Sequence, residues 1–366
     1  MADVVRTRAR FLTSVLALTS CLVAGAISAP SASAQSPDDP AVIARSIFLP
    51  MEVEGTVQQI DPVEHRVVRT IDGLGSNPFV LQELPDHSKI YASRLFSLEA
   101  TLPVIDKRSG RVIKNIPTVG APYTDMRTTA DGSELYLSTT ASVVQVVDTK
   151  TDTIARTLPI VLPPAPGHIE VSPDNKTLYV LSEAGVLTRY DAHTGALIGQ
   201  PLLLGDTQTG WGALNRAGDT MYVRTLSGVR IVDLRSFAVV RTIDIGLLAA
   251  PFVFTLTPDE RQLWVCNFGD NTISIIDTAS ARIVHTIAMP DGMPASVGFS
   301  PDGSKAYVSN LGPTSNFHYV PAIPKLAAQL ANNGPGSLDI YDTKTLQRVD
   351  QIPVGRTPLF GIYPSA

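Results

Sequence analysis

Residues 272–277 read TISIID, a short alternating segment that ends in aspartate. Segments of the same kind end at Asp61, Asp106, Asp148, Asp191, Asp233, Asp277 and Asp342. The intervals between successive aspartates are 45, 42, 43, 42, 44 and 65 residues. A repeat of about 40–45 residues built from short alternating segments is typical of a β-propeller with one four-stranded sheet per repeat. The chain is therefore predicted to be an all-β protein, a seven-bladed propeller of four-stranded antiparallel blades.

The clearest repeat covers residues 251–287 and shows the order of strands and turns in one blade. Alternating segments predict strands at 252–256, 262–266, 272–277 and 281–287. The first two are joined by Thr-Pro-Asp-Glu, in which proline presets the first corner of a turn. The same order of strand, turn and strand recurs in the other repeats.

The recurring aspartates have two interpretations. Carboxylates at regular intervals can ligate cations, but each copy falls on a different blade. Each aspartate except Asp61 is also followed within three residues by Ser or Thr. In a tight turn such an aspartate accepts local backbone N–H bonds. We predict a structural role for them and no metal site.

Four segments resemble the YVTN-type β-propeller repeats of surface-layer and YncE-like proteins. They are Ser300-Pro301-Asp302-Gly303, Tyr307-Val308-Ser309-Asn310, the strand ending at Asp277, and Val354-Gly355-Arg356-Thr357-Pro358. The likeness covers nearly the whole chain after residue 34. It implies an extracytoplasmic seven-bladed propeller, and it brings no catalytic residue because the family motif is structural.

The two ends of the chain are expected to complete one blade. Residues 359–364 read as a first strand with no second strand after it. Residues 46–49, 55–61 and 66–71 read as a second, third and fourth strand without a first. A shared blade would close the ring and hide two sheet edges that otherwise invite aggregation.

Residues 1–34 have the layout of a secretory signal peptide. Arg6, Arg8 and Arg10 precede an apolar stretch, and Ala32-Ser33-Ala34 is a small-residue cleavage site. Leu18 to Cys21 resembles a lipoprotein box, but the apolar run continues beyond it, so a lipid anchor at Cys21 is not favoured. We expect a bacterial protein that is secreted or associated with the cell wall. Residues 35–45 are expected to be a flexible leader, and residues 46–366 the propeller.

Composition excludes several function classes. The net charge is −5 and no run of basic residues follows residue 34, which argues against nucleic acid as the partner. No second stretch is apolar enough for a membrane span. Cys266, the one cysteine after the signal, is predicted to be a buried thiol. We expect no cofactor, because motifs for metals, phosphates and a nucleophilic serine are absent. The protein is expected to be a monomer.

Candidate site residues come from the first strands, which line the channel of a propeller. Alignment of these strands on the proline of the following turn gives two depths. Five residues before it stand Val80, Asp125, His168, Gly212, Val253, Ser296 and Leu359; three before it stand Gln82, Arg127, Glu170, Leu214, Thr255, Gly298 and Gly361.

Two adjacent blades thus bring Asp125, Arg127, His168 and Glu170 together, with Gln82 on a neighbouring blade. His168 is a candidate general base that a carboxylate can tune. Arg127 is a candidate clamp for a carboxylate or an enolate-like anion. The alternative is that these charges pair with one another and fill the channel. Because Pro122 stands one place early, a slip of one residue would turn the side chains of that strand to the other face.

A long insertion and a tryptophan complete the candidates. Residues 311–336 extend the last full repeat, carry His318 and Tyr319, and contain a predicted short helix at 324–331. Such an insertion could cover the channel mouth above His168 and bind ligand, or be passive. Trp211 begins a channel strand and could stack on a ligand, although core packing is its alternative role.

Two main functions follow from these predictions. The first is a secreted propeller that binds a small ligand, or a protein or cell-envelope partner, through its channel mouth and loop-rich face. The second is a cofactor-independent lyase or lactonase, with His168 as base, Glu170 or Asp125 orienting it, and Arg127 stabilising the anion. Streptogramin lyases and muconate-lactonising enzymes share this architecture but no identifiable catalytic motif with the chain. A third reading, single-stranded DNA binding as in some YncE-like relatives, is weakened by the acidic charge.

Overall fold

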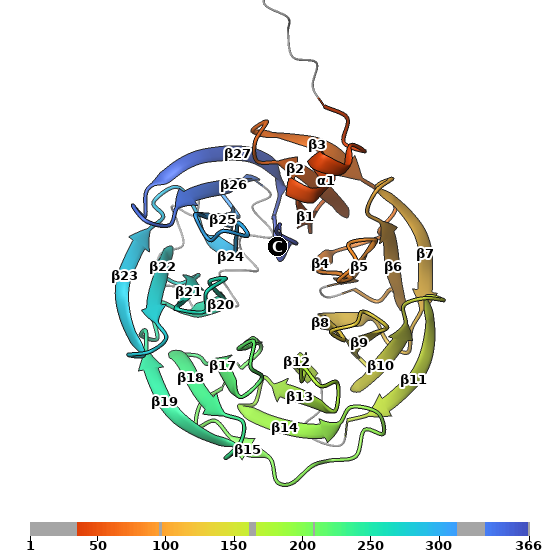
Figure 1. The fold of residues 1–366 in the computed structure, drawn as a ribbon, viewed down its shortest axis with the longest axis vertical. Helices are drawn as coiled ribbons and strands as arrows, with labels where there is room; N and C mark the ends of the chain where they lie inside the picture. The colour runs from red at the N-terminus through yellow and green to blue at the C-terminus, as the bar shows by residue number, and fades with distance from the viewer. Residues whose placement is uncertain (1–34, 95–96, 161–165, 208, 313–333, 365–366) are drawn as a thin grey trace, which may run out of the picture. The chain divides into compact units, whose positions relative to one another are not determined.

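The computed structural model describes residues 35–94, 97–160, 166–207, 209–312 and 334–364. Seven sheets stand in a ring around a central axis, each with its first strand innermost (Figure 1). The predicted seven-bladed propeller is confirmed. Six sheets have four strands and the first has three.

We number the blades in chain order. Blade 1 has β1 (Ile47–Met51), β2 (Thr56–Asp61) and β3 (Arg66–Ile71); blade 2 has β4 (Pro78–Glu83), β5 (Lys89–Arg94), β6 (Thr101–Asp106) and β7 (Arg111–Pro117); blade 3 has β8 (Pro122–Thr128), β9 (Glu134–Thr139), β10 (Val143–Asp148) and β11 (Thr153–Pro159); blade 4 has β12 (Pro166–Val171), β13 (Thr177–Ser182), β14 (Val186–Asp191) and β15 (Leu202–Leu203). Blade 5 has β16 (Gly212–Leu214), β17 (Thr220–Arg224), β18 (Gly228–Asp233) and β19 (Ala238–Asp244); blade 6 has β20 (Pro251–Leu256), β21 (Gln262–Asn267), β22 (Thr272–Asp277) and β23 (Arg282–Ala288); blade 7 has β24 (Pro294–Phe299), β25 (Lys305–Asn310), β26 (Pro335–Asp342) and β27 (Arg348–Arg356).

The recurring aspartates have the predicted structural role. Each accepts the backbone N–H of the Ser or Thr three residues later, in the pairs Asp106–Ser109, Asp148–Thr151, Asp191–Thr194, Asp233–Ser236, Asp277–Ser280 and Asp342–Thr345. These bonds close the turn between the third and fourth strand of six blades. In blade 1 Asp61 accepts the N–H three residues later as well, but from Glu64, so no turn hydroxyl stands there.

The hydrophobic core lies between neighbouring blades rather than within one blade. Trp264 and Ile275 of blade 6, for example, pack against Phe299 and Val308 of blade 7. Cys266 belongs to the same cluster, and burial raises the pKa of its thiol. Burial of apolar surface between sheets is how a chain of this length avoids the size limit of a single core.

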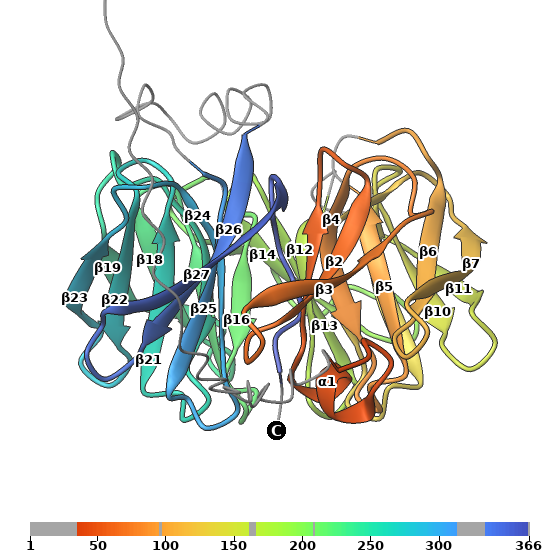
Figure 2. The same ribbon diagram turned by 90° about the horizontal axis from the view of Figure 1, so that it is seen from above.

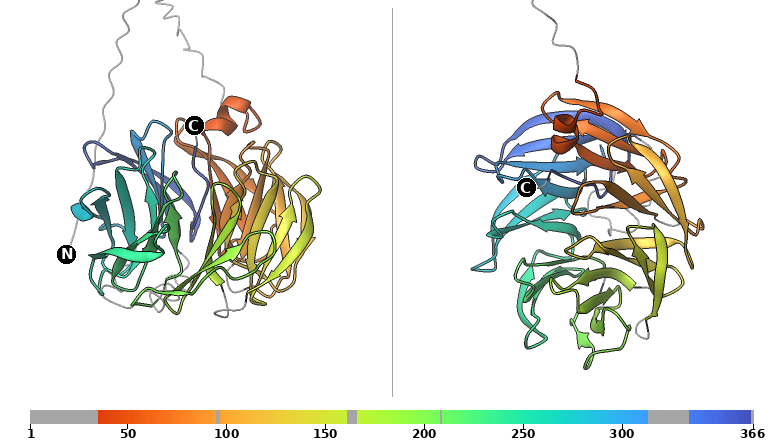
Figure 3. Two further views of the ribbon diagram at one scale, coloured as in Figure 1. Left: turned by 60° about the horizontal axis from the view of Figure 1, so that its bottom comes forward. Right: turned by 45° about the vertical axis from the view of Figure 1, so that its right-hand side comes forward.

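The C-terminal segment closes the ring as predicted. Ile362 and Phe48 exchange backbone hydrogen bonds of 2.9 and 3.0 Å, which adds this segment to β1 as the missing first strand. The segment also pairs with the next blade, since the Leu81 N–H donates to the Phe360 carbonyl at 3.1 Å. The last described part of the C-terminal segment runs toward the side that carries the helix α1 (Pro40–Arg45), as Figures 2 and 3 show.

The leader expected to be flexible, residues 35–45, contains α1. Asp39 caps the helix by accepting the Ala41 N–H at 2.8 Å, and proline occupies the first turn, where no hydrogen-bond donor is needed. Val42 is the buried residue of the helix. Part of the segment predicted as a leader is therefore helical, because Asp39 and Pro40 begin a helix whose apolar residue Val42 is buried.

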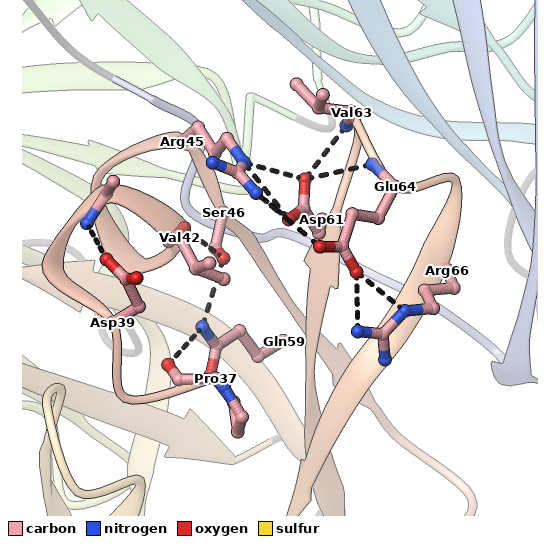
Figure 4. Close-up of polar contacts among 11 residues, drawn as sticks. Pro37, Asp39, Val42, Arg45, Ser46, Gln59, Asp61, Val63, Glu64 and Arg66 are labelled. Carbon is pink, nitrogen blue, oxygen red and sulfur yellow. Dashed lines mark hydrogen bonds and ion pairs between the residues drawn. The ribbon is translucent and has the colours of Figure 1, made fainter. Parts of the chain in front are cut away.

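Arg45 at the end of α1 supplies what blade 1 lacks. Its guanidinium binds the fully buried Asp61 through Nε and Nη2, at 2.9 and 2.6 Å (Figure 4). Burial by itself raises the pKa of Asp61, but Arg45 and two backbone N–H groups hold that pKa below its ordinary value. The N-terminal helix is thus held to blade 1 by an ion pair with the aspartate of its turn.

Replacement of this arginine should loosen the N-terminal end. Arg45→Ala is expected to lower the free energy of unfolding by about 1.5–3 kcal/mol, because a buried carboxylate loses its charged partner. Arg66→Ala is the matched control, since Arg66 pairs with Glu64 at the surface and such pairs contribute about 0–1 kcal/mol. Urea unfolding of both variants measures the difference. Equal losses in the two variants would contradict a role for Arg45 in holding α1.

No helix within the described ranges is long and apolar enough to cross a membrane. Most of the predicted insertion at 311–336 lies outside the described residues. Of that range, Leu311 and Gly312 follow β25, and β26 begins at Pro335.

Candidate functional site

The register of the first strands shows which side chains share a depth in the channel. In five blades the residue predicted three places before the turn proline pairs with an aromatic residue of the second strand. The pairs are Gln82 with Tyr91, Arg127 with Tyr136, Glu170 with Tyr179, Thr255 with Trp264 and Gly298 with Tyr307. The alignment is therefore correct for these blades. It is one residue out in the other two.

In blade 5 the aromatic residue Tyr222 pairs with Ala213, and not with Leu214. Trp211, and not Gly212, therefore shares the depth of Asp125 and His168. The turn explains the slip. Asn215 accepts the Asp219 and Thr220 N–H groups.

In blade 4 the matching turn begins at Ser172, directly before Pro173. Arg216 therefore stands where the other blades have proline. The alignment on proline takes Ala217, the residue after it, as the reference.

In blade 1 the bonded pair Phe48–Ile362 shows that the alignment is also one residue out, in the opposite direction along the chain. Phe360, and not Leu359, faces the channel at the depth of Val80, with which it forms a bridge. Two positions predicted as glycine and leucine are thus aromatic.

The slip that Pro122 suggested in blade 3 does not occur. Between Pro122 and Met126 the register of β8 shifts by one residue more than in β20 or β24. A bulge of this kind absorbs an extra residue without turning the rest of the strand over. Asp125 and Arg127 consequently keep the predicted depth.

The four charged residues of blades 3 and 4 meet, as predicted. Asp125 lies 2.5 Å from Arg127 Nη1 through one oxygen and 2.5 Å from His168 Nδ1 through the other. Glu170 Oε1 lies 3.0 Å from Arg127 Nε and 3.2 Å from His168 Nε2. Each carboxylate therefore bridges the same two cationic groups, and we call these four residues the charged cluster.

The charged cluster is deeply buried. Asp125 and His168 are 1% and 0% exposed, whereas the Arg127 side chain is 22% exposed. Burial by itself raises the pKa of Asp125, but Arg127 and His168 hold it below its ordinary value. Burial also lowers the pKa of His168, but Asp125 and Glu170 outweigh this effect and raise it. A protonated His168 balances the charges of the cluster.

This arrangement limits what His168 can do chemically. Both ring nitrogens face a carboxylate: Nε2 is hydrogen-bonded to Glu170 at 3.2 Å, and Nδ1 lies 2.5 Å from Asp125 Oδ2 as an ion-pair contact. A general base needs a nitrogen that is free to accept a proton from a substrate. His168 is therefore placed to position Asp125 and Glu170, and Arg127 is the member of the cluster that reaches the channel.

A cavity of about 480 Å³ lies beside Arg127 in the channel. Its wall includes Arg127, Trp211, Thr255, Ser296, Gly298 and Phe360. Three residues of the turns between first and second strands line its mouth, Arg216, Pro258 and Pro301, together with Pro364 of the C-terminal segment. It therefore opens on the face that carries these turns, which we call the turn face. Figure 2 shows α1 on the same side.

Aromatic rings form one side of the cavity. The rings of Trp211 and Phe360 are 5.1 Å apart, and Trp211 is 5.4 Å from the His168 ring. The Trp211 N–H donates to the Phe254 carbonyl at 3.1 Å, which fixes the indole. Tyr363 also lines the cavity and binds the Ser296 hydroxyl at 2.7 Å.

The remaining predicted site residues separate from the cluster. Gln82 turns to its own strand, where its amide donates to the Glu83 carbonyl at 3.0 Å. His318 and Tyr319 lie outside the described residues. The insertion leaves β25 at the end opposite to the turn face, so the cavity does not open toward the described ends of that insertion.

Sequence reasoning missed Phe360, Tyr363 and Arg216. Alignment on the polar residue that begins each turn, instead of on proline, would have placed Arg216 at the mouth and Trp211 in the ring. Phe360 carries no such signal, because a bulge in the terminal segment sets its depth. Across the described part of the chain, no three His, Cys, Asp or Glu side chains are grouped so as to hold a metal ion.

Comparison with known proteins identifies the fold alone. No protein-family model matches the chain, and no curated protein matches it in sequence. Hydrazine synthase of Kuenenia stuttgartiensis is similar in structure with a TM-score of 0.65 and 17% identity, over 75% of this chain and 91% of that one. The dihydro-heme d1 dehydrogenase NirN is similar with a TM-score of 0.63 and 15% identity, over 88% of this chain and 75% of that one.

These likenesses place the chain among seven-bladed propellers that also occur in enzymes. At such low identity they carry no chemistry to this chain, because one fold hosts many functions. The resemblance to YVTN-type repeats stays a prediction.

Proposed function

We propose that this protein is an exported propeller that binds a small molecule in its central channel. The observation that carries the proposal is the cavity of about 480 Å³, in which a mostly apolar wall meets one half-buried guanidinium. Small-molecule sites are usually cavities of this size with a few fixed polar groups. The signal-like sequence of residues 1–34 and the YVTN-type repeats support export.

Arg127 is the proposed polar anchor. Its Nη1 donates to Asp125 and to the Met126 carbonyl, and its Nε faces Glu170. No residue in the described part of the chain accepts a hydrogen bond from its Nη2. The guanidinium is thus held in place from behind and keeps donors for a ligand, which is the form of a preorganised site.

The lyase or lactonase reading is the second candidate, and the geometry favours it less. It needs His168 as a base, but both ring nitrogens face carboxylates and the ring is fully buried. Binding needs only Arg127 and the apolar wall. A protein or cell-envelope partner at the loop-rich face is a further alternative that the ligand experiment can distinguish.

A fragment screen with a filled-cavity variant tests the proposal. Thr255 lines the cavity, and among the described contacts its hydroxyl has no hydrogen bond, so Thr255→Phe should fill the space without breaking one. Thr242→Phe on the exposed outer strand β19 is the matched control. We expect ligand-observed NMR to find fragments that bind the unmodified protein and the control, and that lose binding at least about tenfold, or 1.4 kcal/mol, in Thr255→Phe.

Two results would count against channel binding. Fragments that bind all three proteins equally would place the site outside the channel cavity. A screen without any hit would favour a protein partner or a purely structural role.

A further inference from the structure

The charged side chains that line the channel cavity are all cationic. Arg127 and Arg216 line it, and the described lining residues include no Asp, Glu, Lys or His. The carboxylates nearest to Arg127 stand behind its guanidinium, where Asp125 is 1% exposed and Glu170 is 8% exposed. A ligand in the cavity therefore meets cationic groups first.

The Nη2 atom of Arg127 determines which ligand group the cavity favours. Nη1 and Nε are occupied by Asp125, Met126 and Glu170, and Nη2 keeps two N–H donors. A hydrogen bond from a guanidinium to a carboxylate is shorter and stronger than one to a neutral acceptor. The favoured ligand group is consequently an anionic oxygen.

His168 keeps Arg127 available to an anion. With a neutral His168, the charged cluster would carry one negative charge, and with a protonated His168 it carries none. The groups that face this ring are Asp125 and Arg127 from β8 and Glu170 from β12, while Trp211 on the side of blade 5 is uncharged. Anion affinity is therefore expected to fall as pH rises through the pKa of His168.

The rest of the wall fits a flat apolar body. Trp211 and Phe360 are tilted by 35° to each other, and Tyr363 and Phe299 line the same cavity. Aromatic walls of this kind add favourable ring contacts to the burial of apolar area. At the mouth, Arg216 is exposed and donates to the Pro258 carbonyl at 2.9 Å, so its charge stays at the entrance.

We propose that the channel ligand is an organic anion, a carboxylate on a flat apolar or aromatic body, that enters from the turn face and binds Arg127 Nη2. Arg216 draws the anion to the mouth, as a positive charge at the entrance of a cleft does for an anionic ligand. This inference rests on the proposed small-molecule site and names its class of ligand.

Three probes of one shape test the charge preference. They are 2-naphthoate, 2-naphthamide and protonated 2-naphthylmethylamine, titrated calorimetrically into the protein. We expect the carboxylate to bind about tenfold more tightly than the amide, since a charged hydrogen bond exceeds a neutral one by roughly 1.4 kcal/mol. The ammonium probe should bind least. Thr255→Phe should abolish binding of the carboxylate and the amide.

Variants assign the preference to the two arginines. Arg127→Gln should weaken carboxylate binding more than amide binding, and so remove the advantage of the carboxylate. Because this change leaves Asp125 and Glu170 short of a partner, Arg127→Lys is the second variant, which keeps the charge but loses the planar fork. Arg216→Gln should slow carboxylate association and weaken its dependence on salt without affecting the amide.

The outcomes separate the inference from the proposed function. If the amide binds as tightly as the carboxylate, or if Arg127→Gln leaves the carboxylate preference intact, the anion inference is overturned while the channel site stands. If none of the three probes binds, the anion inference is also overturned. The fragment screen with Thr255→Phe then decides whether channel binding fails as well.

Discussion

Deletion of residues 358–366 is expected to leave the propeller unable to fold. The deletion removes the first strand of blade 1 together with Leu359, Phe360 and Ile362, which are 0%, 4% and 9% exposed. Loss of three large buried side chains costs roughly 5–9 kcal/mol. It also removes backbone bonds to β1 and β4. This loss is comparable to the whole stability of an ordinary domain, about 5–15 kcal/mol.

Circular dichroism and urea unfolding of the truncated protein measure this effect. We expect insoluble or non-cooperatively unfolding protein, because the deletion exposes the edges of β1 and β4 at once. A synthetic peptide of residues 356–366, added during refolding, should restore a cooperative transition. A truncated protein that is soluble and unfolds cooperatively without the peptide would contradict closure by this segment.

Local rules made most of the fold predictable from the sequence. The four strands predicted in residues 251–287 match β20 to β23 within one residue at each end. They do so because alternation, turn proline and Asp-x-x-Ser turns all act over a few residues. The sharing of blade 1 was also predictable, since it follows from counting strands at both ends of the chain.

The candidate site was predictable only in part. Asp125, Arg127, His168 and Glu170 were brought together correctly because their strands are neighbours and their turns are regular. The depths of Trp211 and Phe360 were wrong by one residue. Blade 5 lacks the turn proline, and a bulge shifts the terminal segment.

The contacts among the four ionisable groups could not be predicted from the sequence. Alignment places four ionisable groups in a channel, but it does not show that both nitrogens of His168 face carboxylates. A histidine held in this way favours binding over catalysis. The role of Arg45 was hidden for a similar reason, because its partner Asp61 is reached only through the fold.

Replacement of Asp125 is expected to be the most damaging single change in the channel. Asp125 accepts from Arg127 Nη1 and from the backbone N–H of Met126, at 2.5 and 2.9 Å, and forms an ion pair with His168 Nδ1 at 2.5 Å. Asp125→Asn keeps the size but removes the charge and puts an amide against cationic donors. Breaking a buried ion pair in this way costs about 3–5 kcal/mol. Asp148→Asn is the matched control, because an amide oxygen can still accept the turn N–H groups at that half-buried position.

The pH dependence of unfolding separates loss of this charge from a simple packing defect. The pKa of His168 is raised in the folded protein, so its stabilisation is complete below 6.5 and is lost as pH rises through the folded pKa. The pKa of Asp125 is lowered, so its stabilisation is present above 3.8 and is lost as pH falls through the folded pKa.

Urea unfolding on both sides of pH 6.5 should therefore show the unmodified protein losing stability on the alkaline side. In Asp125→Asn this loss should largely disappear, because His168 no longer gains from protonation in the folded state. If the variant is destabilised by the same amount at every pH, Asp125 acts through packing alone. His168 would then be neutral in the folded protein, and the charged cluster would no longer leave Arg127 free to bind an anion.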